Sequence, residues 1–282
     1  MLETTHHWLP IIIAVYVPVS FVITYSIAVK NKHVEPVFPY VSYTGTIPPE
    51  SCVFGQLLNI GAALAGVIIY TRYRQILYHF EQNSPAKYLL HINTAAFITG
   101  LLTIFGVSLV GNFQATNILE VHLLGAFLAF GVSFVYMILQ TIISCKSVPS
   151  ENDGNSPCIK GFRIVLCVVD LVVLILLGIL TPVAISKGPG PGKSRLHWSA
   201  DEPGYAEHLV ATISEWLVAF ITVIYFATFY KEFKHFRMKP PEVIYYNEQT
   251  GIDWCSCSFS IFNKCSSVVN PVENQATEEA KK

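Results

Sequence analysis

VLCVVDLVVLILLGIL, the stretch at residues 165–180, decides the fold class, because Asp170 is its only charged residue. A helix rises about 1.5 Å per residue, so about 20 consecutive apolar residues cross the ~30 Å hydrocarbon core of a bilayer. The apolar segment around this stretch, from Phe162 to Ile185, is long enough to do so. A second stretch, from Leu217 to Tyr230, carries no charge at all. Both stretches predict membrane-spanning helices.

Working outward from them, the hydropathy of the chain predicts six membrane spans. They run roughly from Trp8 to Val29, Val53 to Tyr70, Leu90 to Val110, Ile118 to Ser144, Phe162 to Ile185 and Glu207 to Tyr230. The mean hydropathy is +0.47 and only 13% of the 282 residues are charged, about half of the roughly 25% usual in soluble domains. We predict an all-α polytopic membrane protein, a six-helix transmembrane bundle with two long non-cytosolic loops. The bundle is expected over residues 1–236, and a mostly disordered cytosolic tail over residues 237–282.

The positions of Lys and Arg predict the orientation, because cytosolic loops carry an excess of positive charge. One side of the predicted topology holds Arg72, Arg74, Lys87, Lys146, Lys160, Arg163, Lys231, Lys234, Arg237, Lys239, Lys264, Lys281 and Lys282. The other side holds Lys30, Lys32, Lys187, Lys193 and Arg195. The excess on the first side predicts that both termini are cytosolic. The net charge of −1 gives no indication of nucleic-acid binding.

The two predicted non-cytosolic loops differ in composition. The first, from His33 to Glu50, contains four prolines and three aromatic residues. This composition favours extended backbone and tight turns over helix, with the aromatic rings suited to the membrane interface. The second loop opens with a glycine- and proline-rich hinge from Lys187 to Gly192 and then becomes polar and aromatic.

Polar residues inside the predicted spans are the candidate site, because ionisable groups at bilayer depth cost about 2.5–3.5 kcal/mol each on insertion scales. Asn59, His122, His208 and Glu215 are predicted to form a polar centre that binds a lipid headgroup, passes protons or ligates a metal. His208 and Glu215 lie seven residues apart and therefore share a helix face. The alternative is that these residues make interhelical hydrogen bonds, with the two histidines close to water at the helix ends. Asp170 has no Lys or Arg at matching depth.

Three cysteines in the predicted tail, Cys255, Cys257 and Cys265, leave two interpretations open. Acylation would tether the tail to the membrane, whereas unmodified cysteines would be ordinary cytosolic thiols. A zinc site is disfavoured, because the cysteine spacing is short and the tail contains no histidine. The common hydrolase and phosphate-loop motifs are absent. The sequence thus predicts no metal, no cofactor and no catalytic residue.

Three groups of residues, taken together, resemble one family. They are PYVSYTGTIPPE at residues 39–50 with CVFG at 52–55 and Leu58-Asn59; GNFQ at 111–114 before His122; and LHW at 196–198 with Gly204-Tyr205, His208 and Glu215-Trp216. In this combination the chain resembles the damage-regulated autophagy modulator (DRAM) family, within the wider FRAG/DRAM/SFK group, over roughly residues 8–236. One position departs from the family pattern, because Tyr43 stands where an acidic residue usually follows Pro-Tyr-Ile-Ser.

The resemblance implies a six-span protein that promotes autophagy in lysosomes or related endomembranes, without enzymatic activity; the plasma membrane stays open as an alternative. It singles out the first-loop motif residues Pro39, Tyr40, Gly45, Pro48, Pro49 and Glu50. The expected partners are membrane lipids and unidentified proteins that bind the cytosolic loops and tail. The rival hypothesis is a lipid-modifying enzyme or lipid-signalling regulator that uses His122, His208 and Glu215. A third is a proton or ion conductor that uses Asp170 and Glu215.

Overall fold

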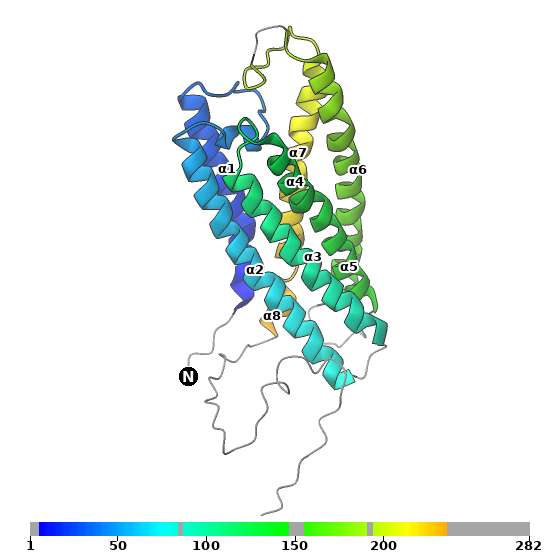
Figure 1. The fold of residues 1–282 in the computed structure, drawn as a ribbon. Helices are drawn as coiled ribbons and strands as arrows, with labels where there is room; N and C mark the ends of the chain where they lie inside the picture. The colour runs from blue at the N-terminus through cyan, green and yellow to red at the C-terminus, as the bar shows by residue number, and fades with distance from the viewer. Residues whose placement is uncertain (1–5, 84–86, 147–154, 191–193, 236–282) are drawn as a thin grey trace, which may run out of the picture. The chain divides into compact units, whose positions relative to one another are not determined.

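The computed structural model describes residues 6–83, 87–146, 155–190 and 194–235, and every regular element in those ranges is helical (Figure 1). The elements are η1 (His6–Trp8), α1 (Leu9–Lys30), η2 (Ser42–Gly45), α2 (Glu50–Asn83), α3 (Lys87–Asn112), α4 (Leu119–Ala126), the π-helical η3 (Phe127–Val132), α5 (Ser133–Lys146), α6 (Pro157–Lys187), α7 (Tyr205–Ala227) and α8 (Tyr230–Lys234). Six helical segments in the described ranges are long and apolar enough to cross a membrane; α4, η3 and α5 form the fourth, and α7 with α8 the sixth. The predicted all-α, six-span bundle is confirmed.

The spans close into a ring in chain order. Helix α1 packs against α2 and α7, α2 against α3, α3 against α4 and α5, α5 against α6, and α6 against α7. The first and last described residues meet at one end of the bundle, where the Trp8 ring of η1 lies 5.4 Å from the Tyr230 ring of α8 (Figure 1). We call this the α8 end. The opposite end carries the α1–α2 and α6–α7 loops.

The outer surface of the ring is apolar. On α6, side chains such as Val165, Val168, Val172 and Ile179 are more than half exposed. Exposed apolar side chains over a whole helix face are unfavourable in water, whereas a bilayer accommodates them. The face of α6 that turns inward is the more polar one, and it buries Arg163 and Asp170 completely.

The helices run past the predicted apolar stretches. Helix α2 continues from the predicted end at Tyr70 to Asn83, and α6 begins at Pro157 rather than at Phe162. Ser156 caps α6, since its hydroxyl accepts the Ile159 N–H at 3.4 Å, and a proline at the first helical position needs no N–H partner. Hydropathy predicts only the part of a helix that lies in lipid. The backbone hydrogen bonds continue each helix beyond that part.

Helices α3 and α4 approach each other unusually closely. A Cβ on Gly106 would lie 2.6 Å from the Ala129 backbone nitrogen and 2.7 Å from the Gly125 carbonyl oxygen. Small residues that allow backbones to approach are the usual means of packing helices in membranes. The contact falls at η3, a π-helical interruption that the hydropathy of a continuous predicted span did not reveal.

Candidate functional site

The end of the bundle opposite α8 is covered by two loops that bond to each other. We call residues 31–49, 188–190 and 194–204 the cap. The Glu35 N–H donates to the Leu196 carbonyl at 2.9 Å, and the ring Nε2 of His197 lies 3.0 Å from the Lys32 carbonyl oxygen. The first loop is mostly irregular, as its prolines predicted, with one turn of 3-10 helix at η2. The cap is therefore one connected layer.

Two consecutive residues of α7 hold the cap to the bundle. The buried Glu215 accepts the Val41 N–H at 2.5 Å through Oε2, and it also interacts with the N–H and hydroxyl of Ser42. The neighbouring Trp216 donates its ring N–H to the Pro39 carbonyl at 2.9 Å. Backbone N–H groups buried away from water need a partner. Glu215 thus supplies an acceptor for the start of η2.

His208 lies one heptad before Glu215, as its spacing predicted, but its surroundings are aromatic. Its ring stacks on Trp198 with centroids 4.4 Å apart and meets Tyr40 edge-on at 5.2 Å. Its Nδ1 has no hydrogen-bond partner in the described part of the chain. The Tyr40 hydroxyl lies 3.3 Å from the Thr181 hydroxyl, to which it donates. Burial raises the pKa of both Tyr40 and Tyr43, so these cap hydroxyls stay protonated at physiological pH.

Asn59 and His122 lie among different partners. Asn59 exchanges hydrogen bonds with Asn112 at 3.2 Å and accepts the Ser108 hydroxyl at 2.8 Å, which joins α2 to α3. His122 Nδ1 lies 2.7 Å from the Phe113 carbonyl oxygen. Across the described ranges, no hydrogen bond joins any two of Asn59, His122, His208 and Glu215. The four predicted residues occupy three places, and only His208 and Glu215 meet the same cap segment.

The motif residues of the first loop are mostly structural supports. Glu50 is buried at the start of α2, where His33 and the side-chain amide of Asn31 both contact its carboxylate. A Cβ on Gly45 would lie 2.2 Å from the Phe54 ring, so only glycine fits there. Pro39 and Tyr40 are buried, whereas Pro48 and Pro49 are exposed. The predicted acylation sites Cys255, Cys257 and Cys265 lie outside the described residues.

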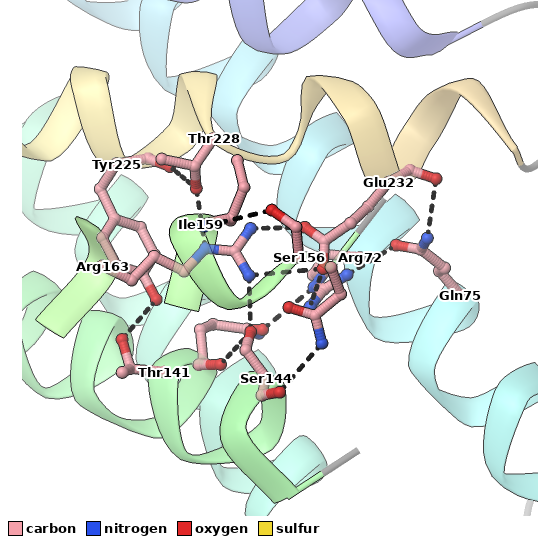
Figure 2. A network of polar contacts seen from close by, with 12 residues as sticks. Arg72, Gln75, Thr141, Ser144, Ser156, Ile159, Arg163, Tyr225, Thr228 and Glu232 are labelled. Carbon is pink, nitrogen blue, oxygen red and sulfur yellow. Dashed lines mark hydrogen bonds and ion pairs between the residues drawn. The ribbon is translucent and has the colours of Figure 1, made fainter. Parts of the chain in front are cut away.

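The α8 end contains a buried charge cluster that the sequence did not indicate (Figure 2). Arg72 of α2 and Arg163 of α6 converge on Glu232 of α8, and all three are at most 4% exposed. Arg163 forms a two-pronged ion pair with the carboxylate, and Arg72 Nη2 lies 3.1 Å from its Oε1. We call these three residues the charge cluster.

Neutral groups satisfy the remaining donors of the charge cluster. Arg72 donates to Gln140 and Gln75 at 3.2 and 2.9 Å, while Arg163 donates to Thr228 and Ser144 at 2.8 and 2.6 Å. The Phe229 ring contacts both guanidinium groups, at 5.0 and 4.8 Å from its centroid, within cation–π range. The cluster thereby fastens α2, α5, α6 and α8 together at one point.

One sequence signal could have found part of the charge cluster. Arg72 lies four residues from both Ile68 and Ile76, which are buried, so it continues the inward face of α2. The predicted spans left Arg72 in a loop and Arg163 at the start of the fifth span, whereas the structure buries both side chains in the interior of the bundle. Both residues still lie at the predicted end of the bundle.

Asp170 is an ionisable residue inside the fifth span for which the sequence offered no partner. It is completely buried on the inward face of α6, and neither carboxyl oxygen has a hydrogen-bond partner in the part of the chain that the structure describes. No ion pair in that part includes it. The described residues also contain no group of three or more His, Cys, Asp or Glu side chains placed to hold a metal ion.

Comparison with known proteins places these features in a family. The profile of the Frag1/DRAM/Sfk1/Cwh43P N-terminal domain matches residues 6–236. DNA damage-regulated autophagy modulator protein 2 of Mus musculus is 33% identical over 233 residues, covering 82% of this chain and 85% of the relative. DNA damage-regulated autophagy modulator protein 1 of Homo sapiens is 35% identical over 234 residues, covering 82% and 92%. Modulator of macroautophagy TMEM150B-B of Xenopus laevis is 32% identical over 250 residues, covering 85% and 93%. No solved structure matches the chain significantly.

Proposed function

Because the chain belongs to the Frag1/DRAM/Sfk1/Cwh43P family, we propose that it is a non-enzymatic modulator of autophagy in the membrane of lysosomes or related endomembranes. The observation that carries the proposal is that the match covers the whole six-span bundle, and that the relatives quoted above are named as autophagy modulators. The charge cluster and the cap would hold the bundle as a rigid platform. Partners would bind its cytosolic loops and tail.

The arrangement of the candidate residues favours a modulator over a lipid-modifying enzyme. An acid–base or metal mechanism needs its groups within hydrogen-bond distance of one another. His122 bonds to a main-chain carbonyl, His208 lies in an aromatic box, and Glu215 accepts main-chain N–H groups of the cap. These contacts are typical of residues that hold helices and loops in place.

The test is to delete the gene in cells and to measure autophagic flux and the lysosomal lipid profile together. We expect reduced flux, rescued by the wild-type chain, with the tagged protein on lysosomes or related endomembranes. Rescue with Glu215→Gln separates the alternatives, since glutamine keeps an acceptor for the Val41 N–H but removes the carboxylate. A modulator should keep most of its activity. A correctly located but inactive Glu215→Gln, with an altered lipid profile, would favour the enzyme.

We propose that the α8 end faces the cytosol. Among the described residues, eight Lys and Arg lie at that end and four at the cap end, and positive residues concentrate on the cytosolic side. Both chain termini would then be cytosolic. Protease treatment of sealed vesicles with a tag at each terminus tests this orientation, and protection of either tag would overturn it.

A further inference from the structure

Two exposed cysteines lie at the α8 end of the bundle, one on each of two packed helices. Cys145 is the last residue but one of α5, and Cys158 is the second residue of α6. Both are free thiols. Hydrogen bonds fasten these two helix ends together, because Ser144 accepts the Asn155 side-chain amide at its carbonyl and the Arg163 guanidinium at its hydroxyl, at 2.9 and 2.6 Å (Figure 2). We call Cys145 and Cys158 the thiol pair.

Both thiols lie at the depth where the apolar part of their helix ends. Cys158 is four residues before Phe162, the start of the apolar stretch, which is a distance of about 6 Å along the helix. Cys145 comes directly before Lys146, the last residue of α5. Juxtamembrane cysteines are the usual sites of reversible S-acylation, because a fatty acyl chain bonded there can enter the bilayer.

The outer face of α6 offers such a chain a direct path into the bilayer. Phe162, Val165 and Val169 follow Cys158 by 4, 7 and 11 residues, so they lie on the same face of the helix. All three side chains are exposed. A chain bonded to Cys158 therefore runs along apolar side chains that already face lipid. The residues below Cys145 on α5, Ile138 and Ile142, are only partly exposed.

The charges around the thiol pair suit an anionic acyl donor. Lys146 follows Cys145 directly, and Lys160 lies two residues after Cys158. Acyl-coenzyme A carries several negative phosphate groups next to its thioester. Lysine side chains beside the thiols attract those phosphates and so bring the thioester toward the pair.

The other two cysteines in the described ranges lack this combination of features. Cys167 is partly buried inside the fifth span, where its sulfur lies 3.5 Å from the Thr141 hydroxyl. Cys52 is exposed, but it lies near the cap end, and no Lys or Arg occurs within ten residues of it in the sequence. Cys52 is therefore a built-in control for exposure alone.

We propose that the thiol pair is S-acylated by a long-chain acyl-coenzyme A, with Cys158 as the principal site. The cysteine sulfur attacks the thioester carbonyl carbon, the bond from that carbon to the coenzyme A sulfur breaks, and the thiol proton leaves with coenzyme A. The reaction exchanges one thioester for another, so it needs no oxidant or reductant. Because six spans already hold the chain in the membrane, the acyl chain serves to hold the adjoining ends of α5 and α6 at the bilayer surface.

The inference rests on the proposed cytosolic location of the α8 end, since acyl-coenzyme A is formed in the cytosol, and it does not depend on a role in autophagy. The test is acyl exchange on the full-length chain expressed in mammalian cells. Free thiols are blocked, thioesters are cleaved with hydroxylamine, and the released thiols are tagged and mapped by mass spectrometry. We expect tags on Cys158 and, at lower occupancy, on Cys145.

Variants measure the share of the thiol pair in a chain whose tail cysteines, Cys255, Cys257 and Cys265, are all replaced by serine. In that chain, Cys145→Ser combined with Cys158→Ser should lower the tagging to the level seen without hydroxylamine. Cys52→Ser is the matched control and should leave the tagging unchanged. The mapping on the wild-type chain needs no variant, so a folding defect in a serine variant does not remove the test.

Tagging that persists in the double variant would overturn the proposal. So would thiols that a disulfide reductant releases and hydroxylamine does not, because the pair would then be a disulfide. Tags on Cys52 instead of the thiol pair would overturn the proposed orientation as well. Untagged thiols at both ends, in a chain whose termini are open to protease in sealed vesicles, would overturn the acylation alone.

Discussion

The cap end and the α8 end of the bundle each bury a glutamate, but they compensate its charge differently. At the α8 end, Glu232 lies between Arg72 and Arg163, and neutral side chains take up the remaining donors. At the cap end, Glu215 receives N–H groups from the cap and is part of no ion pair in the described part of the chain. Two carboxylates in one fold are thus placed in opposite environments.

The difference separates a carboxylate held by two cations from a carboxylate held by hydrogen bonds alone. The Glu232 carboxylate is fully paired, and its loss would leave two buried arginines without a counter-charge. Glu215 is instead satisfied by hydrogen bonds from the cap alone, at the end of a cavity. Four substitutions test this contrast. Two of them replace the carboxylates of Glu232 and Glu215, and the other two change Gly45 and Tyr40 in the cap.

The largest effect should follow Glu232→Ala. Removing one partner of a buried ion pair costs about 3–5 kcal/mol, because the remaining charges are buried without compensation. Here two guanidinium groups would be left, so we expect poor expression and a strongly lowered melting temperature in detergent. The neighbouring Lys231→Ala is the matched control, since Lys231 is exposed. A Glu232→Ala protein as stable as that control would show that the charge cluster is not essential to the bundle.

Glu215→Leu should have the next largest effect. Leucine leaves the buried Val41 N–H without an acceptor, at a cost of about 1–3 kcal/mol, and it should loosen the cap. Glu215→Gln keeps an acceptor and should be close to wild type in stability. Limited proteolysis of the first loop, compared between the two variants, measures the effect. If both variants resist proteolysis as wild type does, Glu215 does not hold the cap.

The contrast between the two ends also shows which features a sequence can reveal. The six spans follow from hydropathy, because an apolar run of about 20 residues has no other stable environment. The shared face of His208 and Glu215 follows from helical period. The irregular first loop follows from its prolines. Each of these is a property of one continuous segment.

The contacts between segments could not be predicted in the same way. Val41 and Glu215 are 174 residues apart, and Arg163 and Glu232 are 69 apart. No local pattern states which helix faces which, so Asn59 and His122 were grouped with residues that they do not contact. Arg72 looked like a loop charge because hydropathy ends where the lipid ends, whereas α2 continues to Asn83.

Gly45→Ala should destabilise the cap by an amount comparable to Glu215→Leu. The new methyl group would overlap the Phe54 ring, and overpacking costs about 1–3 kcal/mol. We expect a loss within that range, because the closest atoms include Cβ and Cγ at the base of the buried Phe54 side chain, which cannot swing aside. Gly178→Ala is the control, since nothing lies within 4 Å of a Cβ there. Thermal unfolding of both variants should show a decrease for the first and no decrease for the second.

The smallest effect should follow Tyr40→Phe, which removes one hydroxyl from the cap and keeps the ring. That hydroxyl donates to Thr181 at 3.3 Å, a long hydrogen bond, so we expect a loss of about 0.5 kcal/mol, the lower limit for a neutral pair. The edge-on contact with His208 remains in the phenylalanine variant, whereas Tyr40→Ala would lose it and should destabilise the cap more.

The pH dependence of the melting temperature, compared between wild type and Tyr40→Phe, provides a second test of how the cap is held. Burial raises the pKa of Tyr40 above its ordinary value of about 10. The folded chain therefore retains this proton longer than the unfolded chain, and the group lowers stability only as pH rises above about 10. Wild type and Tyr40→Phe should consequently differ by the same small amount at every pH between 5 and 8. A difference in melting temperature that grows across that range would mean that Tyr40 ionises in the folded cap below its ordinary pKa, contrary to its burial.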